Sequence, residues 1–435
     1  MIALVVAAWA DPPPIVEPAY RVHPDGLVVR TAPEPGASVR GAIAAGASFR
    51  TLGPATGPNC AAGWSRVEAQ GFVCLDGTAI THDPPRPQPE VLEYDPPDPS
   101  EYATYVETGE YHARVPTRIV PGIYARRYRR FAGKLYASAE AYERNEAPVG
   151  QLSHEIGAKE RFVSIRETSR GPVLVRGDGQ VAALSDVYLY PVSRLAGFDL
   201  ENHPLRAGTW PAFAIDYQGA SIRKSASAEA EVVGTVPYHG PLVISSTPAD
   251  PTGHWWEVVE GPVRGFVEDT RGIRHPVTSP SRPPGVGDSE LWVDVELGQQ
   301  VVMVHRGDAL VYFTLTSTGA APMGTPTGTY RLIEKHAFKD MRSRPDADDW
   351  YAVEDVPWTL TFRPRYSLHT AYWHWGYGRT ASHGCVNLSA RDAAWLYDQL
   401  PPKLPDGWTS LYVTPDDHPA VVRVRRGATI DLDDT

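Results

Sequence analysis

The sequence predicts a mainly β protein that is divided into several domains. Short runs of β-branched and aromatic residues alternate with turn residues, as in VVGTV from Val232, GTYRLI from Gly328 and TLTF from Thr359. Proline and glycine are abundant, at 42 and 38 residues, whereas long amphipathic helical periodicity is scarce outside residues 389–400. A single core rarely grows beyond about 250–300 residues, so a chain of 435 residues is expected to hold several cores.

Two segments predict small β domains that share one pattern. Residues 20–82 contain the runs GLVVRTAPEPG, VRGAI, GWSRVE and GFVC, and residues 207–276 contain ASIRKSAS, VVGTV, HWWEVV and GFVE. Two copies of the same order indicate an internal repeat. The order resembles that of bacterial SH3-like modules. The resemblance implies two small β-barrels that bind cell wall, act as spacers or pack on a neighbouring domain.

Proline-rich segments predict the boundaries between the domains. Residues 83–100 and 277–288 are expected to be linkers, since closely spaced prolines favour an extended, stiff chain. Residues 101–206 between them predict a β-rich domain of unassigned role. Its cluster Arg126-Arg127-Tyr128-Arg129-Arg130 is interpreted as a solvated face, with contact to an anionic wall polymer as the alternative. Residues 416–435 are acidic and unpatterned, which predicts a tail.

The charge and the start of the chain bear on its location. The formal net charge of −11 argues against nucleic acid as a partner. Residues 1–19 begin with an apolar run that ends in Ala8-Trp9-Ala10, a cleavage-like pattern, but a positive start is lacking. We interpret this start as a shortened signal peptide, with a disordered apolar terminus as the alternative. No other stretch is apolar enough to span a bilayer. The signal-like start and the few cysteines favour export to the periplasm or cell envelope.

The chain has three cysteines, and their positions separate one from the other two. Cys60 and Cys74 lie in the first small β domain, where they form either a disulfide in an oxidising compartment or a pair of unlinked buried thiols. Cys385 stands alone near the C-terminal end. A free thiol at that position is what a nucleophile requires.

The segment SHGCVNL from Ser382 to Leu388 predicts an acyl-transfer site. If it is extended, His383 and Cys385 project from the same face, and the imidazole can take the thiol proton. Gly384 between them leaves the backbone bare, so a carbonyl substrate can approach its N–H group. Two other interpretations exist: Cys385 as a buried structural thiol, and His369, His374, His383 and Cys385 as zinc ligands. The zinc interpretation lacks the C-x-x-C or H-E-x-x-H spacing of common sites, and His374 is interpreted as a structural or surface residue.

Three ordered motifs resemble the YkuD-type L,D-transpeptidase domain over about residues 289–415. They are the opening strands LWVDVELGQQVVMVHRGDALVYFTLTSTG from Leu291, the TPxGxY-like turn GTPTGTYRL from Gly324, and SHGCVNL preceded by His369-Thr370. Many relatives have His-Gly where this chain has His369-Thr370. The resemblance implies a β-rich catalytic domain that needs no metal or organic cofactor.

The resemblance also implies a role for each matching residue. Cys385 is expected to attack the stem-peptide carbonyl and release the terminal D-amino acid, with His383 as the base. The Thr370 carbonyl is expected to orient that base, and His369 to line the acyl site. The N–H groups of Gly384 and Cys385 are expected to form the oxyanion hole.

Four residues are candidates for substrate contact: Ser382, Trp373, Tyr351 and Asn387. Tyr351 and Trp358 belong to the segment KHAFKDMRSRPDADDWYAVEDVPW from Lys335, where the family carries a lid that this sequence does not match. Trp358 is therefore a further candidate for substrate contact. Trp373 and Trp375 are interpreted first as packing residues and second as stacking surfaces. Asn387 is expected to fix the loop by a hydrogen bond.

One helix is predicted next to this motif. Ser389 with Asp392 gives a capping-box-like start, Ala393, Leu396, Tyr397 and Leu400 recur at helical spacing, and Pro401-Pro402 ends the helix. We expect this helix to brace the loop that holds Cys385.

The sequence therefore predicts an exported peptidoglycan L,D-transpeptidase that uses stem peptides as donors. The acceptor amine is left open between a second stem peptide, which gives a 3-3 crosslink, and an anchored envelope protein. An L,D-carboxypeptidase or endopeptidase with the same Cys-His site is one alternative. A non-catalytic wall-binding scaffold is the other.

Overall fold

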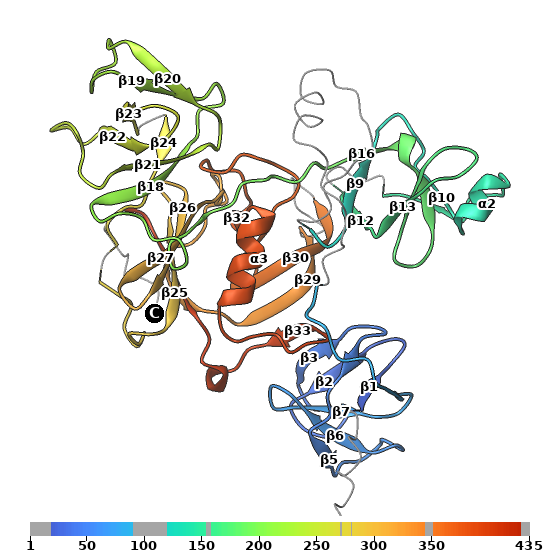
Figure 1. Cartoon of the computed structure of the whole chain (residues 1–435). Helices are drawn as coiled ribbons and strands as arrows, with labels where there is room; N and C mark the ends of the chain where they lie inside the picture. The colour runs from blue at the N-terminus through green and yellow to red at the C-terminus, as the bar shows by residue number, and fades with distance from the viewer. Residues whose placement is uncertain are drawn as a thin grey trace, which may run out of the picture. The chain divides into compact units, whose positions relative to one another are not determined.

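The computed structural model describes residues 19–89, 120–153, 158–269, 272–279, 281–343 and 351–427. Strands dominate this part of the chain, which confirms the mainly β fold class (Figure 1). The chain divides into two compact units, residues 1–88 with 405–408 and residues 89–404 with 409–435. The described residues do not include residues 1–18 of the expected signal peptide. They also do not include residues 90–100 of the first expected linker.

The first unit contains the N-terminal β domain. One sheet has the order β4-β1-β8, and a second ladder runs β3-β2-β7-β6-β5. A disulfide joins Cys60 to Cys74, so the bonded alternative is the one that the structure shows. The strands are β1 (Tyr20–Val22), β2 (Leu27–Arg30), β3 (Val39–Ile43), β4 (Ser48–Phe49), β5 (Gly53–Ala55), β6 (Trp64–Val67), β7 (Gly71–Cys74) and β8 (Ala79–Thr81).

The second small β domain has one sheet of order β20-β19-β23-β22-β21-β18-β24. Across this sheet, the five neighbours β20-β19-β23-β22-β21 correspond in order to the ladder β3-β2-β7-β6-β5 of the N-terminal domain. Its strands are β18 (Thr209–Ala214), β19 (Ala220–Arg223), β20 (Val232–Val236), β21 (Pro241–Ser245), β22 (Trp255–Glu260), β23 (Gly265–Glu268) and β24 (Ile273–Arg274).

The repeat extends to individual contacts. Arg30 is paired with Phe72 in the first copy, and Arg223 is paired with Phe266 in the second. In each copy the register shifts just before this arginine, and its Nη1 donates to a carbonyl seven residues later, at 2.8 Å and 2.6 Å. The internal repeat is thus visible in strand pairing as well as in sequence. The assignment of these domains as SH3-like modules stays a prediction.

The middle domain is predicted to be β-rich, and its described residues form two small sheets and one short helix. The sheets have the orders β11-β10-β15-β14-β13 and β12-β9-β16. The helix α2 (Ala139–Glu143) begins at Ser138, whose side chain accepts a hydrogen bond from the N–H of Ala141. The strands are β9 (Ile123–Arg127), β10 (Lys134–Tyr136), β11 (Gly150–Gln151), β12 (Glu160–Phe162), β13 (Ser164–Arg166), β14 (Val173–Val175), β15 (Val181–Ala183) and β16 (Val187–Leu189), with a 3-10 turn at Leu184–Asp186.

The C-terminal domain is built on two sheets. The first has the order β17-β27-β26-β25-β34-β28, and in the second β32-β31-β30-β29-β33 are neighbours. The strands are β17 (Phe198–Asp199), β25 (Leu291–Glu296), β26 (Val301–Arg306), β27 (Ala309–Leu315), β28 (Gly328–Arg331), β29 (Glu334–Arg342), β30 (Ala352–Arg363), β31 (Tyr366–Thr370), β32 (Val386–Leu388), β33 (Trp408–Tyr412) and β34 (Val421–Arg425).

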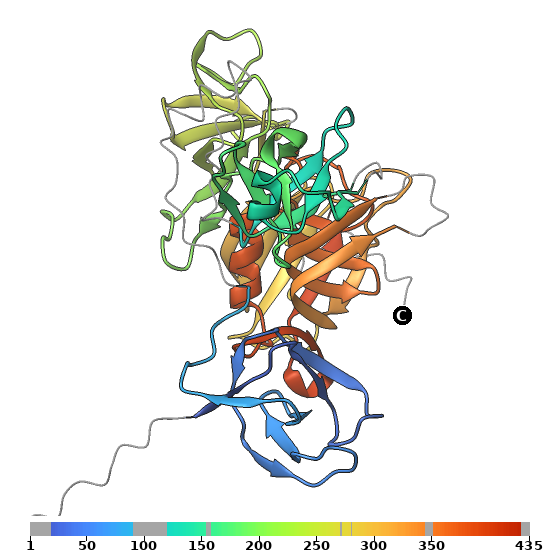
Figure 2. The ribbon, with the colours of Figure 1, turned by 90° about the vertical axis from the view of Figure 1, so that its right-hand side faces the viewer.

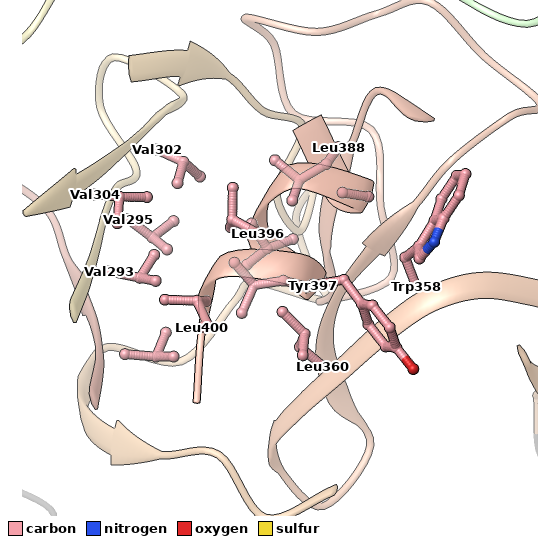
Figure 3. Packing of buried hydrophobic residues seen from close by; sticks show 14 of the residues in the cluster. Val293, Val295, Val302, Val304, Trp358, Leu360, Leu388, Leu396, Tyr397 and Leu400 are labelled. Carbon is pink, nitrogen blue, oxygen red and sulfur yellow. The ribbon is translucent and has the colours of Figure 1, made fainter. Parts of the chain in front are cut away.

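The helix α3 (Ala390–Gln399) packs between these two sheets. Its Leu396, and Leu400 directly after it, meet valines of β25 and β26 on one side and Leu360 and Leu388 on the other (Figure 3). The same helix also contacts β30 and β31 of the second sheet. Figure 2 shows the molecule turned by 90°. Burial of large aliphatic side chains contributes about 1.5–3 kcal/mol each, so this layer is a major source of stability.

The helix has the predicted start and stop. Ser389 accepts a hydrogen bond from the N–H of Asp392 at 3.2 Å, and the helix ends before Pro401-Pro402. The Asp392 carboxylate points into the core, where the hydroxyls of Tyr312 and Thr314 donate to it at 2.8 Å and 2.6 Å. The helix is therefore fixed to β27 immediately after the Cys385 segment, which confirms its bracing position.

The expected tail at residues 416–435 is wrong in its first part. Val421–Arg425 form β34, which is fully buried between β25 and β28 and runs parallel to β25. The run VVRVR alternates as a strand does. Its two arginines and the acidic residues around it are typical of an exposed segment, so the sequence does not indicate that this strand is buried in the core. Those arginines tolerate burial because an acidic partner faces them.

That partner is Asp294 on β25. Its carboxylate accepts from Arg423 Nε and Nη2 at 3.1 Å and 2.9 Å, from Arg425 Nε at 3.0 Å, and from Ser279 Oγ at 2.6 Å. The side chains of Asp294 and Arg423 are completely buried, and that of Arg425 is 1% exposed. Hydrogen bonds and the charges of the two guanidinium groups hold the pKa of Asp294 below its usual value against the opposing effect of burial.

Within the described residues, no helix combines the length and apolarity that a bilayer crossing requires.

We predict that Asp294→Asn lowers the free energy of unfolding by about 3–5 kcal/mol, because two buried arginines lose their counter-charge. Thermal unfolding followed by calorimetry measures the loss at pH 7. Since the folded-state pKa of Asp294 is lowered, its stabilisation is present above the unfolded pKa near 4 and disappears as pH falls through the folded value. Asp288→Asn is the control, because the Asp288 side chain is 96% exposed. Equal melting temperatures for the two variants would contradict the prediction.

Candidate functional site

A small cavity of about 80 Å³ brings the predicted motif residues together. Its wall comes from several separate segments: the end of β29, the start of β30, the end of β31 with the residues after it, the loop before β32, and one residue of the middle domain. The lining residues are Lys159, Met341, Tyr351, Val353, His369, Trp373, Ser382, His383, Cys385 and Asn387. Seven residues predicted for catalysis or substrate contact line this one cavity: Tyr351, His369, Trp373, Ser382, His383, Cys385 and Asn387.

The segment before β32 is bent instead of extended. Residues 383–385 form a bend, Gly384 has φ +119°, and the strand starts only at Val386. The expectation that His383 and Cys385 share a strand face is therefore wrong in its premise. Both side chains reach the cavity because the bend turns them into it. A φ of this value favours glycine, which explains the residue at position 384.

Cys385 is a free, half-buried thiol on the cavity wall. Burial raises its pKa, and the Ser367 backbone and the Lys339 charge lower it by less. Its Sγ lies 3.6 Å from the carbonyl oxygen of Arg365, which can only accept a hydrogen bond. The resting group is consequently the neutral thiol, and a base must take its proton during the attack.

His369 has the geometry of such a base. It is 2% exposed, and its Nδ1 lies 2.9 Å from the carbonyl oxygen of Thr370. Because a carbonyl can only accept, Nδ1 carries the proton and Nε2 keeps a free lone pair. Burial lowers the pKa of His369 to about 4, so the imidazole is neutral at pH 7.

Strand pairing places His369 next to the nucleophile segment. β31 and β32 are parallel neighbours, and His369 is opposite Asn387, two residues after Cys385. The Thr370 carbonyl thus orients His369, whereas the expectation was that it orients His383. The carbonyl is a backbone group, so the contact does not depend on the Thr370 side chain.

His383 occupies a different position. Its side chain is exposed, and its ring lies against Tyr351 with 5.0 Å between ring centroids. It lines the opening of the cavity together with Tyr351, which comes from the segment expected to form a lid. The structure therefore offers two histidines at the cavity, one buried and backbone-oriented and one exposed.

Ser382 closes the bend on itself. Its hydroxyl donates to the carbonyl of Cys385 at 2.5 Å and accepts from the N–H of Gly384 at 3.1 Å. The Gly384 N–H, expected in the oxyanion hole, is therefore engaged by Ser382. Within the described residues the Cys385 N–H has no such partner and remains a candidate oxyanion donor.

Thr325 was not predicted as a site residue, although its TPxGxY-like motif was noted. Its hydroxyl donates to the Gly384 carbonyl at 2.8 Å and accepts from the Gly319 N–H at 2.9 Å. A bridge between Gly319 and Ser382 runs beside these contacts. The motif thus stabilises the bend at residues 383–385 through hydrogen bonds. The sequence feature that could have indicated this role is the Thr-Pro pair of the motif, which lies at a turn far in sequence from Cys385.

Asn387 and His374 hold the other end of the bend. Asn387 is 2% exposed, and its side-chain amide lies 2.8 Å from His374 Nε2. The N–H of Gly376 donates to His374 Nδ1 at 3.2 Å, so both ring nitrogens of His374 are used. His374 is a structural residue, as interpreted from the sequence, and neither of its nitrogens is available to a metal.

Two of the predicted contact residues form aromatic walls, and one candidate does not reach the cavity. Trp373 and Tyr351 line it, and the Trp373 ring lies over His369 with 5.8 Å between centroids. Trp358 is 5% exposed and packs in the main core beside α3 (Figure 3). Its candidate role in substrate contact is therefore wrong, because its indole is used in core packing.

Comparisons with known proteins find relatives of the C-terminal domain. Residues 290–413 match the YkuD family model, described as the L,D-transpeptidase catalytic domain. L,D-transpeptidase 1 of Mycobacterium tuberculosis is 27% identical over 174 residues, which are 36% of this chain and 66% of that protein. The chain thus spans just under two thirds of this relative.

Solved structures of the same family are also similar. An L,D-transpeptidase from Mycobacterium smegmatis is 15% identical, with 55% of this chain and 89% of that chain covered and a TM-score of 0.26. The Enterococcus faecium L,D-transpeptidase is 16% identical, with 31% and 50% covered and a TM-score of 0.24. On the sequence match, residues 290–413 are an L,D-transpeptidase-type catalytic domain, and this domain holds the Cys385 cavity.

Proposed function

We propose that this protein is a peptidoglycan L,D-transpeptidase that forms a thioester at Cys385. The observation that carries the proposal is the pairing of a free thiol with a buried, backbone-oriented imidazole in one small cavity. The domain in which they lie matches the family over residues 290–413. The donor is the stem tetrapeptide of peptidoglycan, and the departing group is its terminal D-amino acid.

The acylation step follows from this geometry. Nε2 of His369 takes the thiol proton as Cys385 Sγ attacks the donor carbonyl. The S–C bond forms, and the negative charge on oxygen is stabilised by the Cys385 N–H. The peptide C–N bond then breaks, and His369 returns the proton to the departing amine. The products are a thioester and a free D-amino acid, so atoms and charge balance.

His369 replaces His383 as the base in this mechanism. A neutral imidazole with one fixed tautomer accepts a proton at Nε2 without a preceding change of state. His383 is exposed and lies against Tyr351, so we assign it to the substrate-facing rim. The second step reverses the first: His369 deprotonates the incoming amine, which attacks the thioester carbonyl and frees Cys385.

The acceptor is an amine of a second stem peptide, with an anchored envelope protein as the second candidate. Water as acceptor would make the same site a carboxypeptidase. Incubation of the purified protein with a disaccharide-tetrapeptide separates the two reactions. A crosslinked dimer is the expected product, tripeptide alone indicates hydrolysis, and unchanged substrate would support a wall-binding scaffold.

Location in the periplasm or cell envelope belongs to this proposal. Its donor is an envelope polymer, and the disulfide between Cys60 and Cys74 fits an oxidising compartment. The two repeated β domains are proposed as modules that hold the catalytic domain near the wall.

We predict that Cys385→Ala abolishes the covalent adduct with a carbapenem, a β-lactam that acylates enzymes of this family as the resemblance implies. Intact-mass spectrometry measures the adduct, which should appear once per wild-type chain, because Cys60 and Cys74 are disulfide-bonded. An adduct that survives in Cys385→Ala would place the nucleophile elsewhere.

We predict that His369→Gln slows acylation of Cys385 by about 100-fold or more, the usual contribution of a general base. His383→Gln should slow it by less than about tenfold, because it removes a rim contact and leaves the base. Stopped-flow acylation rates measure both, and circular dichroism checks the fold. The reverse order of the two effects would return the role of base to His383.

The pH dependence of acylation tests the same assignment. Since the pKa of His369 is lowered to about 4, the base stays unprotonated as pH falls from 8 to 5, and kcat/KM should decline only near pH 4. Stability falls over part of this range, because the unfolded state binds a proton near pH 6.5 that the folded state refuses. Each point therefore needs a check of the folded fraction. A decline centred at pH 6–7 in fully folded protein would exclude His369.

A further inference from the structure

The middle domain has a pocket of its own, which shares no residue with the Cys385 cavity. Its volume is about 410 Å³, within the usual range of ligand pockets, roughly 300–1,000 Å³. Two tyrosines and two arginines from separate segments line it: Tyr128 and Arg130 after β9, Tyr142 on α2, and Arg170 before β14. We call it the arginine pocket. All its other lining residues are uncharged.

Tyr142 holds one of the two guanidinium groups in place. The Arg170 Cζ lies 4.5 Å from the centre of the Tyr142 ring, and Arg170 Nη1 donates to the Tyr142 carbonyl. The Tyr142 hydroxyl donates to the Arg170 carbonyl at 3.4 Å, and its ring packs edge-on against Tyr136. Within the described residues, Nε and Nη2 of Arg170 donate to no protein acceptor. The cation–π contact thus orients a group that still has free donors.

Arg130 is held in the same way. Its Cζ lies 5.7 Å from the centre of the Tyr128 ring and 4.9 Å from that of Phe131. The N–H of Tyr128 donates to the Asp186 carbonyl at 3.0 Å, which fixes the backbone beside this arginine. In the part of the chain that the structure describes, no protein group hydrogen-bonds to the Arg130 guanidinium.

The nearby carboxylates have other contacts. Glu143 accepts from the N–H of Ser169 at 2.8 Å, and Asp186 accepts from the Ser185 hydroxyl at 3.3 Å. Among the described residues, neither Asp nor Glu lines the arginine pocket, and none forms an ion pair with its two arginines. Two positive charges therefore meet at one pocket without a counter-charge from the protein.

The middle domain as a whole has the opposite charge balance to the chain. Residues 120–190 contain 11 Lys and Arg against 8 Asp and Glu, whereas the whole chain contains 41 against 52. A basic region in an acidic protein attracts anions to that region. The arginine cluster at residues 126–130 thus supplies part of a binding site, and the alternative of contact with an anionic wall polymer is favoured over a solvated face.

The chemistry of the pocket selects the anion. A guanidinium group offers a planar pair of donors that matches the two oxygens of a carboxylate. The polymer on which the proposed reaction acts supplies this group, because every uncleaved stem peptide ends in a free carboxylate. We propose that the arginine pocket binds a stem-peptide carboxylate of peptidoglycan, at a site separate from the one where a donor acylates Cys385. This inference rests on the proposed function.

Purified peptidoglycan sacculi and two double variants test the inference. The pocket variant combines Arg130→Gln with Arg170→Gln. The control variant combines Arg144→Gln with Arg166→Gln, which removes the same charge from exposed positions of the same domain, where each arginine already has a carboxylate partner at 2.7 Å. Sacculi are used untreated and after conversion of their carboxylates to carboxamides. Sedimentation of the full-length protein measures the apparent Kd, and D-amino acid release from a soluble tetrapeptide measures catalysis.

The wild type and the control variant should bind untreated sacculi equally well. The pocket variant should bind about tenfold or more weakly, since loss of a hydrogen bond to a charged group has at least that effect. Amidation should weaken binding of the wild type by a similar factor and have little further effect on the pocket variant. Release of D-amino acid from the soluble donor should be equal in all three proteins, because the arginine pocket is separate from the Cys385 cavity.

A second measurement uses the wild-type protein alone. Phenylglyoxal modifies exposed arginines, and peptide mass spectrometry compares Arg130 and Arg170 with Arg144 and Arg166. A soluble muramyl tripeptide should slow modification of the first pair and leave the second pair unchanged. Poly(glycerol phosphate), at the same concentration of anionic groups, should protect the first pair less than the tripeptide does.

Several results would overturn the inference. Equal losses of binding in the pocket and control variants would reduce the effect to general charge. Full binding by the pocket variant, or better protection by the phosphate polymer than by the tripeptide, would exclude a stem-peptide carboxylate as the ligand. A wild-type protein that releases nothing from the soluble donor would overturn the proposed function, whereas binding and arginine protection would still decide whether the pocket takes a carboxylate.

Discussion

The hydrogen bond between His369 Nδ1 and the Thr370 carbonyl is the contact on which the site depends. It joins a buried ring to the backbone of its own strand end, so the tautomer is set before any substrate arrives. A buried neutral imidazole and a half-buried neutral thiol avoid the free-energy cost of placing two charges in a poorly solvated site in the resting protein. In the proposed mechanism the thiol becomes reactive during the attack, in which the proton moves to His369 as the S–C bond forms.

The rest of the catalytic domain supports that contact. β31 and β32 place His369 beside the residues that follow Cys385, and the buried Asp392 of α3 fixes that helix to β27. Thr325 and Ser382 hold the bend that carries the nucleophile. Each of these is a hydrogen bond inside a packed core, so the reacting groups stand on rigid elements.

Local patterns made much of the fold and of the site predictable. The helix over 389–400 was readable because its cap, its apolar spacing and its terminating prolines agree, and the internal repeat was readable because both copies keep one order of runs. Cys385 was found because three ordered motifs precede and surround it. These features depend on residues close together in the sequence.

The missed features depend on residues far apart. The resemblance points the Thr370 carbonyl at the wrong histidine, because matched motifs give no ring orientation. The sequence conceals β34 as a buried strand, because its arginines are neutralised by Asp294, which is far away in the sequence. Lys159 and Thr325 reach the site only through tertiary pairing. Linear patterns do not encode such contacts.

Nitrogen-15 NMR of the imidazole of His369 tests the central claim most directly. Histidine-labelled wild-type protein, with His369→Gln to identify the resonances, reports which ring nitrogen carries the proton. We expect a neutral ring with hydrogen on Nδ1 and none on Nε2 from pH 5 to 8. A ring protonated at both nitrogens at pH 7, or a neutral ring with hydrogen on Nε2, would contradict it.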